Sequence, residues 1–354
     1  MAATDSRLSW GILGTGRIAH TFTEGLAKSR TGQLVAVGSR QQAVADAFAK
    51  EFGSVRAHGT YEELLADPAV QAVYVSTPHP FHAEWCIKAA RAKKHILCEK
   101  PLTLNYSEAM TVVEAARENG VFLMEGFMYR CHPQTAKLLE LIREGTIGEV
   151  SLIKATFGFN GGFRAEHRLY KNELGGGAIL DVGCYTMSIS RLMAGAALGL
   201  PFANPVQLNG FARLHPETEV DLYSTAMVRF PRDIFAQLST AVGLDLDSGL
   251  QVFGTTGSLC IKNPFTMARE GGETIILHTK GHDEKTEIRV HTSDYLFALE
   301  TDAVGDAVAQ GKLESPFVSI EDTLGNMAAL DAWRSSAGFL YRSEKLTTIL
   351  PNLK

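Results

Sequence analysis

The sequence predicts an α/β protein with two domains, the first a doubly wound parallel sheet and the second built on an open, mostly antiparallel sheet. Apolar β-branched runs alternate with helical stretches from Leu8 to about Met124, a pattern typical of strand–helix–strand units on a parallel sheet. Strand-like runs follow one another without intervening helices between Val206 and Val290, which indicates antiparallel pairing. The length of 354 residues, at about 150 residues per domain, also favours two domains.

The first domain is predicted at residues 1–130, where five strands alternate with five helices. The strands are nearly continuous apolar runs, as burial on both faces of a sheet requires. They are predicted at Ser9–Leu13, Leu34–Ser39, Val70–Ser76, His95–Glu99 and Val121–Glu125. The intervening helices are predicted at Ile18–Ala27, Gln41–Glu51, Tyr61–Leu65, Ala83–Ala92 and Ser107–Asn119.

The second domain is predicted at residues 131–354. It begins with a helix, a long strand and, after a glycine-rich turn, a second helix, predicted at Gln134–Glu144, Glu149–Phe159 and Ala178–Ala194. The closing segments, Tyr295–Gln310 and Ile320–Tyr341, have the helical spacing of apolar residues. These two helices are candidates to pack back on the first domain.

The composition is that of an ordinary globular protein, with 45% hydrophobic and 21% charged residues. Lys and Arg number 34 against 39 Asp and Glu, a net charge of -5, which supplies no basic surface for nucleic acid or an anionic membrane. No stretch is long and apolar enough to span a bilayer, and no apolar leader precedes the first strand, so we expect a cytoplasmic protein. The five scattered cysteines include no Cys-x-x-Cys pair, which argues against a disulfide framework or a zinc ribbon.

A glycine-rich turn, Gly11–Ala19, lies between the first predicted strand and the first predicted helix. Gly14 and Gly16 allow a tight turn and the close approach of a pyrophosphate, and the helix N-terminus supplies amide donors. This context predicts a Rossmann-type dinucleotide site and outweighs the alternative of a purely structural turn. The residues predicted to contact the cofactor here are Gly14, Thr15, Gly16, Arg17 and Ile18.

The end of the second strand predicts which dinucleotide is bound. NAD enzymes place an acidic residue about 20 residues beyond the glycine turn, against the ribose hydroxyls. This chain has Ser39 and Arg40 there, and a guanidinium can grip a 2′-phosphate through charge-assisted hydrogen bonds. We therefore predict NADP as the cofactor, with NAD as the alternative. The other interpretation of Arg40 is a solvated side chain at the start of a helix.

Two loops follow the third and fourth strands, at the edge where open α/β sheets bind ligands. Their predicted cofactor-facing residues are Thr77, Pro78, His82, Glu99 and Lys100. Lys100 can donate to a reacting oxygen and lower the pKa of a neighbouring acid, and the alternative is a solvated lysine paired with Glu99. His79 and His82 lack an obvious third ligand, so no metal site is predicted.

A second glycine-rich segment, Gly175–Tyr185, opens the long helix of the second domain. The three glycines let the helix begin close to other backbone, and Asp181 and Tyr185, four residues apart, share one face of it. A tyrosine near a lysine ammonium can act as a general acid or base at neutral pH, because the positive charge favours the phenolate. Spacing alone equally permits a structural helix cap.

The ordered set of these motifs resembles the glucose-fructose oxidoreductase, inositol dehydrogenase and MocA (Gfo/Idh/MocA) family. The similarity covers nearly the whole chain and rests on Gly11–Ala19, Ser76–Pro78, Glu99–Pro101, Glu125–Pro133 and Gly175–Tyr185. It implies a Rossmann domain followed by an α/β domain whose open sheet often mediates dimers or tetramers, so we expect a homo-oligomer and favour a dimer. It also implies that Lys100 is the catalytic lysine and that Pro101 is a candidate for a cis bond.

The second motif ends in Tyr185, where many members of the family have histidine. This variant resembles the branch that contains dimeric dihydrodiol dehydrogenase, NADP-dependent D-xylose dehydrogenase and glucose-fructose oxidoreductase. The resemblance implies that Tyr185 transfers the proton, that Lys100 is its partner and that Asp181 orients the reacting groups. Arg168 matches an arginine often found before the triple glycine, and it is predicted to contact the cofactor.

The sequence therefore predicts an NAD(P)-dependent oxidoreductase of an aldose, cyclic polyol or trans-dihydrodiol, with Tyr185 as acid or base and Lys100 assisting. The alternatives are a glycosidase or epimerising enzyme of the same family that retains its NAD, and a nucleotide-sensing regulatory protein without turnover. Tyr341–Lys345 fits the Tyr-x-x-x-Lys pattern of short-chain dehydrogenases, but it lies far beyond the nucleotide domain, so chance explains it better. Further pocket candidates, which at such positions are more often core residues, are Phe127, Met128, Arg130, Phe159, Phe163 and Arg164.

Overall fold

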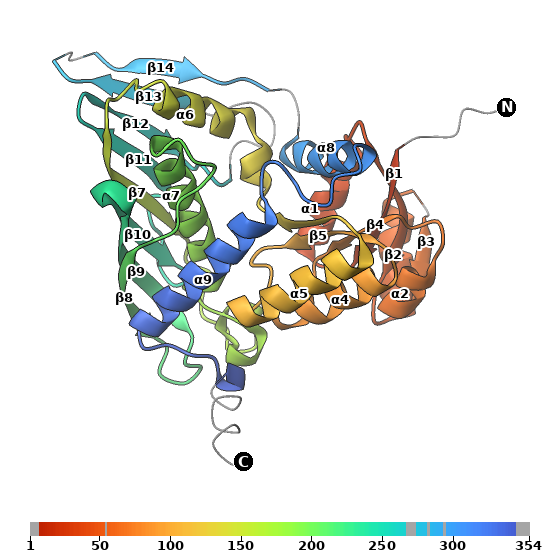
Figure 1. Ribbon diagram of the computed structural model, residues 1–354. Helices are drawn as coiled ribbons and strands as arrows, with labels where there is room; N and C mark the ends of the chain where they lie inside the picture. Colours follow the sequence, from red (N-terminus) through yellow and green to blue (C-terminus); the bar gives the residue numbers. More distant parts are fainter. Residues whose placement is uncertain (1–6, 54, 267–273, 282–283, 293–294, 345–354) are drawn as a thin grey trace. The chain divides into compact units, whose positions relative to one another are not determined.

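The computed structural model describes residues 7–53, 55–266, 274–281, 284–292 and 295–344 and separates them into two compact units. The first unit takes in the described residues of 1–132 and 293–324, and the second takes in those of 133–292 and 325–354. The chain therefore leaves the first unit after His132, two residues beyond the boundary predicted at 130, and returns to it for one late segment. Each unit has its own sheet (Figure 1).

The first unit contains a six-stranded parallel sheet in the order β3-β2-β1-β4-β5-β6, which confirms the predicted doubly wound fold. Its strands are β1 (Leu8–Leu13), β2 (Gly32–Gly38), β3 (Arg56–His58), β4 (Ala72–Val75), β5 (His95–Glu99) and β6 (Leu123–Gly126). Its helices are α1 (Arg17–Leu26), α2 (Gln42–Glu51), α3 (Tyr61–Ala66), α4 (His82–Arg91), α5 (Tyr106–Asn119) and α8 (Leu296–Ala309). The strand β3 was not predicted, because three partly exposed residues carry no buried-strand pattern.

The order of the strands reverses at β1, which pairs with β2 on one side and with β4 on the other. In open α/β sheets, ligands bind outside the carboxyl ends of the strands at this kind of reversal. The segments that follow β1, β2, β4 and β5 therefore gather the predicted cofactor residues, except Arg168 of the second unit, at one edge of the sheet.

Helix α8 returns from far along the chain and packs beside α1 in the core of the first unit (Figure 1). Phe22 of α1 stacks on Tyr74 of β4 with ring centroids 3.8 Å apart, and Phe297 of α8 meets Phe22 edge-on at 6.3 Å. A Cβ at Gly25 would stand 2.4 Å from the Cβ of Phe297, so glycine lets the two helices approach closely. The late helix is thus part of this core.

The second unit contains an eight-stranded sheet in the order β14-β13-β12-β11-β7-β10-β9-β8. Every pair is antiparallel except β7 with β10, which confirms the predicted open and mostly antiparallel sheet. Its strands are β7 (Val150–Gly158), β8 (Gln207–Leu214), β9 (Asp221–Phe230), β10 (Ile234–Ala241), β11 (Gly249–Gly254), β12 (Gly257–Lys262), β13 (Thr274–Thr279) and β14 (Thr286–Arg289).

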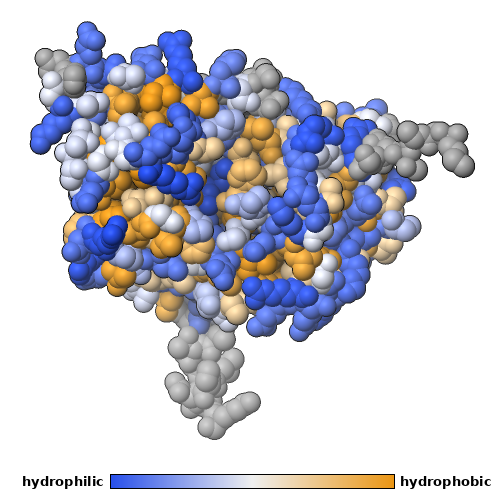
Figure 2. Space-filling model, turned by 45° about the horizontal axis from the view of Figure 1, so that its top comes forward, coloured by the Kyte–Doolittle hydropathy of each residue, from blue (hydrophilic) through white to orange (hydrophobic). Residues whose placement is uncertain are grey.

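One face of this sheet is covered by α6 (Pro133–Arg143) and α7 (Cys184–Ala197), and α9 (Ile320–Ser336) ends in the same unit (Figure 1). Along β9 the residues alternate, so that Ala226 and Val228 are buried while Met227 between them is 46% exposed. Figure 2 shows hydrophobic side chains at the surface among the hydrophilic ones. In the part of the chain that the structure describes, no helix is long and apolar enough to cross a membrane.

Candidate functional site

The turn after β1 has the geometry of a dinucleotide-binding turn. Gly14 has a φ of +106°, its N–H donates to the Gly38 carbonyl at 3.1 Å, and a Cβ there would lie 3.0 Å from the Ser76 hydroxyl oxygen. Gly16 is the N-cap of α1 and has open space within 4 Å of where a Cβ would stand. The first turn of α1 has neither a side-chain cap nor an acidic residue. These features fit an anionic pyrophosphate beside the helix N-terminus.

Ser39 and Arg40 follow β2, and they differ in exposure. Ser39 is buried, and its N–H donates to the His58 carbonyl at 3.1 Å, while Arg40 is exposed. Burial raises the pKa of Tyr61, and the positive charge of Arg40 opposes this rise, which places the guanidinium near the phenol at the start of α3. The arginine is thus at the rim of the sheet edge, where a phosphate could reach it.

His82 joins the loops that follow β4 and β5. Its imidazole is fully buried, with Nε2 2.7 Å from the Thr77 carbonyl oxygen and Nδ1 3.0 Å from that of Pro101. Burial lowers the pKa of His82 to about 4, so at neutral pH the ring carries one N–H and donates to one carbonyl at a time. The Lys100–Pro101 bond is cis, as the family resemblance suggested. The buried His82 ring therefore links the loop after β4 to the loop after β5.

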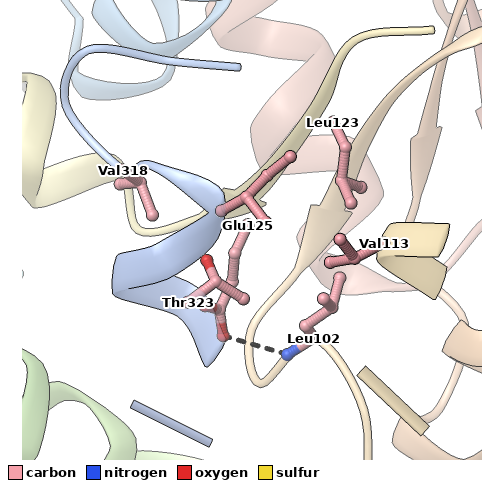
Figure 3. A pocket seen from close by; sticks show the side chains of 7 residues that line it. Leu102, Val113, Leu123, Glu125, Val318 and Thr323 are labelled. Atoms are coloured by element: carbon pink, nitrogen blue, oxygen red, sulfur yellow. Dashed lines mark hydrogen bonds between the residues drawn. The ribbon is translucent and has the colours of Figure 1, made fainter. Parts of the chain in front are cut away.

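Glu125, at the carboxyl end of β6, holds the other side of the same loop. Figure 3 shows its carboxylate accepting a hydrogen bond from the Leu102 N–H, at 2.9 Å. The side chain is 1% exposed, and aliphatic groups from β6, α5 and the start of α9 line most of the small pocket around it. In the sequence, Glu125 stands out only as part of a family motif. An acid at the end of a buried strand was the signal that could have identified its role.

Glu99 and Lys100 directly precede Pro101 and Leu102, the two residues whose backbone His82 and Glu125 contact, and both side chains are half-buried. The Tyr74 hydroxyl donates a hydrogen bond to the Glu99 carboxylate. Burial and the charge of Glu99 raise the pKa of the fully buried Glu300 of α8, so a second acid lies near this end of β5. Thr77, Glu99 and Lys100 thus lie at or just beyond the carboxyl ends of the paired strands β4 and β5.

The glycine-rich segment of the second unit opens a helix that begins with an irregular turn. Gly175 and Gly177 have φ values of +65° and +112°, and the helix predicted from Ala178 to Ala194 begins instead with a π-helical turn at Ile179–Gly183. The α-helix α7 starts only at Cys184. The predicted helix at Ala178–Ala194 is thus confirmed, but its π-helical start was not foreseen, because hydrophobic periodicity does not distinguish a π-helical turn from an α-helical one.

Asp181 lies in this π-helical turn and forms an ion pair with Arg168, whose guanidinium nitrogen is 2.9 Å from Oδ1. The carboxylate side chain is 6% exposed and the arginine side chain is 44% exposed. Tyr185, in the first turn of α7, is 5% exposed and packs edge-on against Phe157 at 5.4 Å and beside Phe265 at 5.5 Å. The second unit therefore brings Arg168, Asp181 and Tyr185 into one short segment.

Several other sequence candidates have structural roles. Tyr341 is fully buried and its hydroxyl donates to the Gly176 carbonyl at 2.8 Å, while Lys345 lies outside the described residues. Arg130 forms a buried ion pair with Asp322 at 2.7 Å. Phe163 is 48% exposed and stacks on His215 with ring centroids 4.1 Å apart.

Comparison with known proteins places this architecture in a family. A profile described as oxidoreductase family, NAD-binding Rossmann fold matches residues 8–127, and the C-terminal domain profile of the same GFO/IDH/MocA family matches residues 135–260. The chain is similar to trans-1,2-dihydrobenzene-1,2-diol dehydrogenase of Mus musculus, with 30% identity over 96% of this chain and 99% of the relative. It is also similar to D-xylose 1-dehydrogenase (NADP(+)) 2 of Haloferax volcanii, with 31% identity over 93% and 97%.

Among solved structures, the 3-ketoreductase KijD10 of Actinomadura kijaniata in complex with NADP and TDP-benzene has a TM-score of 0.83 and 30% identity. The match covers 93% of this chain and 98% of that protein. The fold and the two profiles define an oxidoreductase with an NAD-binding Rossmann domain. The chain belongs to the Gfo/Idh/MocA family.

Proposed function

We propose that the chain is an NADP-dependent dehydrogenase or reductase of an aldose, a cyclic polyol or a trans-dihydrodiol. The observation that carries this proposal is the grouping of Arg168, Asp181 and Tyr185 at the opening of α7, in a chain with an NAD-binding domain. A phenol one turn beyond an ion-paired carboxylate suits proton transfer to a hydroxylated substrate. The names of the relatives, a dihydrodiol dehydrogenase, a xylose dehydrogenase and a ketoreductase, support this substrate class.

The residues that follow the carboxyl ends of the strands in the first sheet fit the cofactor. Backbone N–H groups of the Gly14–Ile18 turn would hold the pyrophosphate, and Ser39 with Arg40 would hold the 2′-phosphate of NADP. When bound, the nicotinamide supplies or accepts the hydride. The further residues proposed to contribute to the cofactor site are Thr77, Pro78, His82, Glu99, Lys100 and Arg168. His82 would act through the two loops that it joins.

In the proposed mechanism, Tyr185 moves the proton and Lys100 supplies charge. The Tyr185 phenolate takes the proton of the substrate hydroxyl during oxidation, and the phenol returns it to the carbonyl oxygen during reduction. The Lys100 ammonium favours the phenolate and stabilises negative charge on the reacting oxygen. Asp181, held by Arg168, orients the sugar or diol through its hydroxyl groups.

Substitution of the two proposed catalytic residues tests this mechanism. Tyr185→Phe keeps the packing against Phe157 and Phe265 but removes the transferable proton, and Lys100→Met removes the charge at similar length. We expect each to lower kcat by roughly 10²- to 10⁴-fold, the usual contribution of general acid–base catalysis. The measurement is absorbance of the reduced cofactor with aldoses, inositols, anhydro sugars and trans-dihydrodiols, using both NADP and NAD.

Binding of NADPH, followed by fluorescence, is the control for Tyr185→Phe and should change by less than about threefold. If Tyr185→Phe or Lys100→Met turned over substrate at the wild-type rate, the proposed proton-transfer roles would be refuted. Tightly bound NAD that is recovered unconsumed after glycoside cleavage or epimerisation would identify the alternative enzyme of the same family. Tight NADP binding without turnover of any substrate would favour a nucleotide sensor.

We also propose that the chain forms a homodimer through the open face of its second sheet. Phe211, Tyr223, Met227 and Phe235 of β8, β9 and β10 are each at least 40% exposed on strands that are paired with one another. Apolar side chains gathered on one sheet face are typical of an interaction surface. A second copy of the chain would remove them from water.

A further inference from the structure

Asp221, the first residue of β9, is a buried carboxyl group at the base of the glycine-rich turn. Its side chain is fully buried, and its Oδ2 accepts a hydrogen bond from the Ile179 N–H at 2.7 Å. A Cβ at Gly177 would stand 2.0 Å from Asp221 Oδ1, so the carboxyl group lies directly against the glycine backbone. Asp221 therefore contacts the turn on both sides of Ala178.

Two more buried side chains hold neighbouring backbone groups of the same turn. The Tyr341 hydroxyl donates to the Gly176 carbonyl at 2.8 Å, and the Thr240 hydroxyl donates to the Ala178 carbonyl at 3.1 Å. Together with Asp221, they pair backbone groups of residues 176, 178 and 179. The three holding side chains come from β9, β10 and the segment after α9, so the turn is tied to elements distant in the sequence.

The residues just beyond these contacts are those proposed to act on substrate. Ile179 is the first residue of the π-helical turn, and Asp181 lies two residues further along it. Tyr185 is the second residue of α7. Asp221 is paired with Leu214 of β8, and from Tyr223 onward β9 is paired with β10 as well, so the sheet holds the first residue of the strand. A displacement of Ile179 would therefore displace Asp181 and Tyr185 with it.

We propose that Asp221 is a positioning residue, which fixes the π-helical turn against the sheet and thereby places Asp181 and Tyr185 for proton transfer. This inference rests on the proposed function of those two residues. Burial raises the pKa of Asp221 to about 7, and the charged or titratable groups that act on it are Arg334 and Tyr341. The hydrogen bond from the Ile179 N–H acts in the opposite direction and lowers the pKa, as a contact that holds the backbone would.

The experiment compares Asp221→Asn, which keeps an acceptor oxygen, with Asp221→Leu, which removes it while keeping the branching and the number of side-chain heavy atoms. We expect the leucine variant to lose roughly 10- to 100-fold in kcat, because small misplacements of catalytic groups have effects of this size. The asparagine variant should stay within about threefold of wild type, and NADPH binding should change by less than about threefold in both. Hydrogen exchange of residues 177–185 in the ligand-free protein should rise in the leucine variant only.

Val228→Ala is the matched control, since Val228 is buried on the same strand, seven residues beyond Asp221. It should lower the unfolding temperature and leave both kcat and exchange at residues 177–185 within about twofold of wild type. Equal losses in the asparagine, leucine and control variants would overturn the proposal and leave only a stabilising role. If wild type turns over no substrate, the proposed function fails, while the exchange data still decide whether Asp221 holds the turn.

Discussion

Single buried polar side chains hold the backbone on which the proposed catalytic residues lie. His82, Glu125, Asp221 and Tyr341 each contact a backbone N–H or C=O group in a loop beside such a residue. Because buried backbone polar groups must be paired, these contacts restrict the loops to few arrangements. Substitutions of these side chains should therefore act through charge and hydrogen bonding more than through apolar packing.

Arg40 is expected to decide the preference between the two dinucleotides. Arg40→Ala removes an exposed guanidinium at the end of β2, and a charge-assisted hydrogen bond lost to a phosphate weakens binding by roughly 10- to 100-fold. We therefore expect the NADPH dissociation constant to rise by that factor and the NADH constant to stay nearly unchanged. Fluorescence titration measures both. Arg91→Ala, an exposed arginine at the end of α4, is the control, and an unchanged preference in Arg40→Ala would exclude the phosphate contact.

Asp221 should make stability depend on pH. Its pKa in the folded protein is raised to about 7, above the ordinary value of 3.8. Between about pH 4 and pH 7 the folded state therefore keeps a proton that the unfolded state has lost. Its contribution to stability is present below that window and falls as pH rises through it, by up to about 1.4 kcal/mol per pH unit.

Urea unfolding of wild type and Asp221→Asn at pH 5 and pH 8 tests this dependence. Because asparagine does not titrate, the wild type should lose more unfolding free energy than the variant between these two pH values. Other acids titrate in both proteins and cancel in the difference. A difference between the proteins that stays constant from pH 5 to pH 8 would contradict the raised pKa.

At the scale of elements, the glycine-rich opening of the π-helical turn depends on the absence of a side chain. Gly177 combines a φ of +112° with contact to Asp221, whereas Gly162 has a φ of +64° and open space around it. Gly162→Ala should lower the unfolding free energy by about 1 kcal/mol through backbone strain alone. Gly177→Ala should lower it by more than about 3 kcal/mol, because strain and steric overlap add. Urea unfolding measures both, and equal effects would show that the contact with Asp221 is unimportant.

At the scale of the whole molecule, the proposed dimer is the feature that one substitution can abolish. Phe211, on β8, is 78% exposed and lies diagonally across from Tyr223 and Met227 of the paired strand β9. Phe211→Asp would place a charge in an interface between two copies and should give monomers in light scattering after size exclusion. Leu313→Asp, at an exposed apolar residue of the first unit, should leave the dimer intact. A monomeric wild type at micromolar concentration would contradict the proposal.

The fold was predictable from local pattern to a large extent, and its misses have local causes. The strand β5 was predicted with its observed bounds, since a buried central strand gives a continuous apolar run. The edge strand β3 was missed because Arg56–His58 is short and partly exposed. The π-helical turn was missed because its residues have the same apolar periodicity as the α-helix that follows.

The sequence by itself determined the two-domain α/β architecture, the dinucleotide turn and the family, because these depend on local spacing of glycines and apolar runs. The tertiary structure decided which distant side chains hold the catalytic segments. Arg168 pairs with Asp181 across irregular turns, and Tyr341, far along the chain, donates to Gly176. Such contacts depend on how separate strands and helices pack, and no spacing along the chain records that packing.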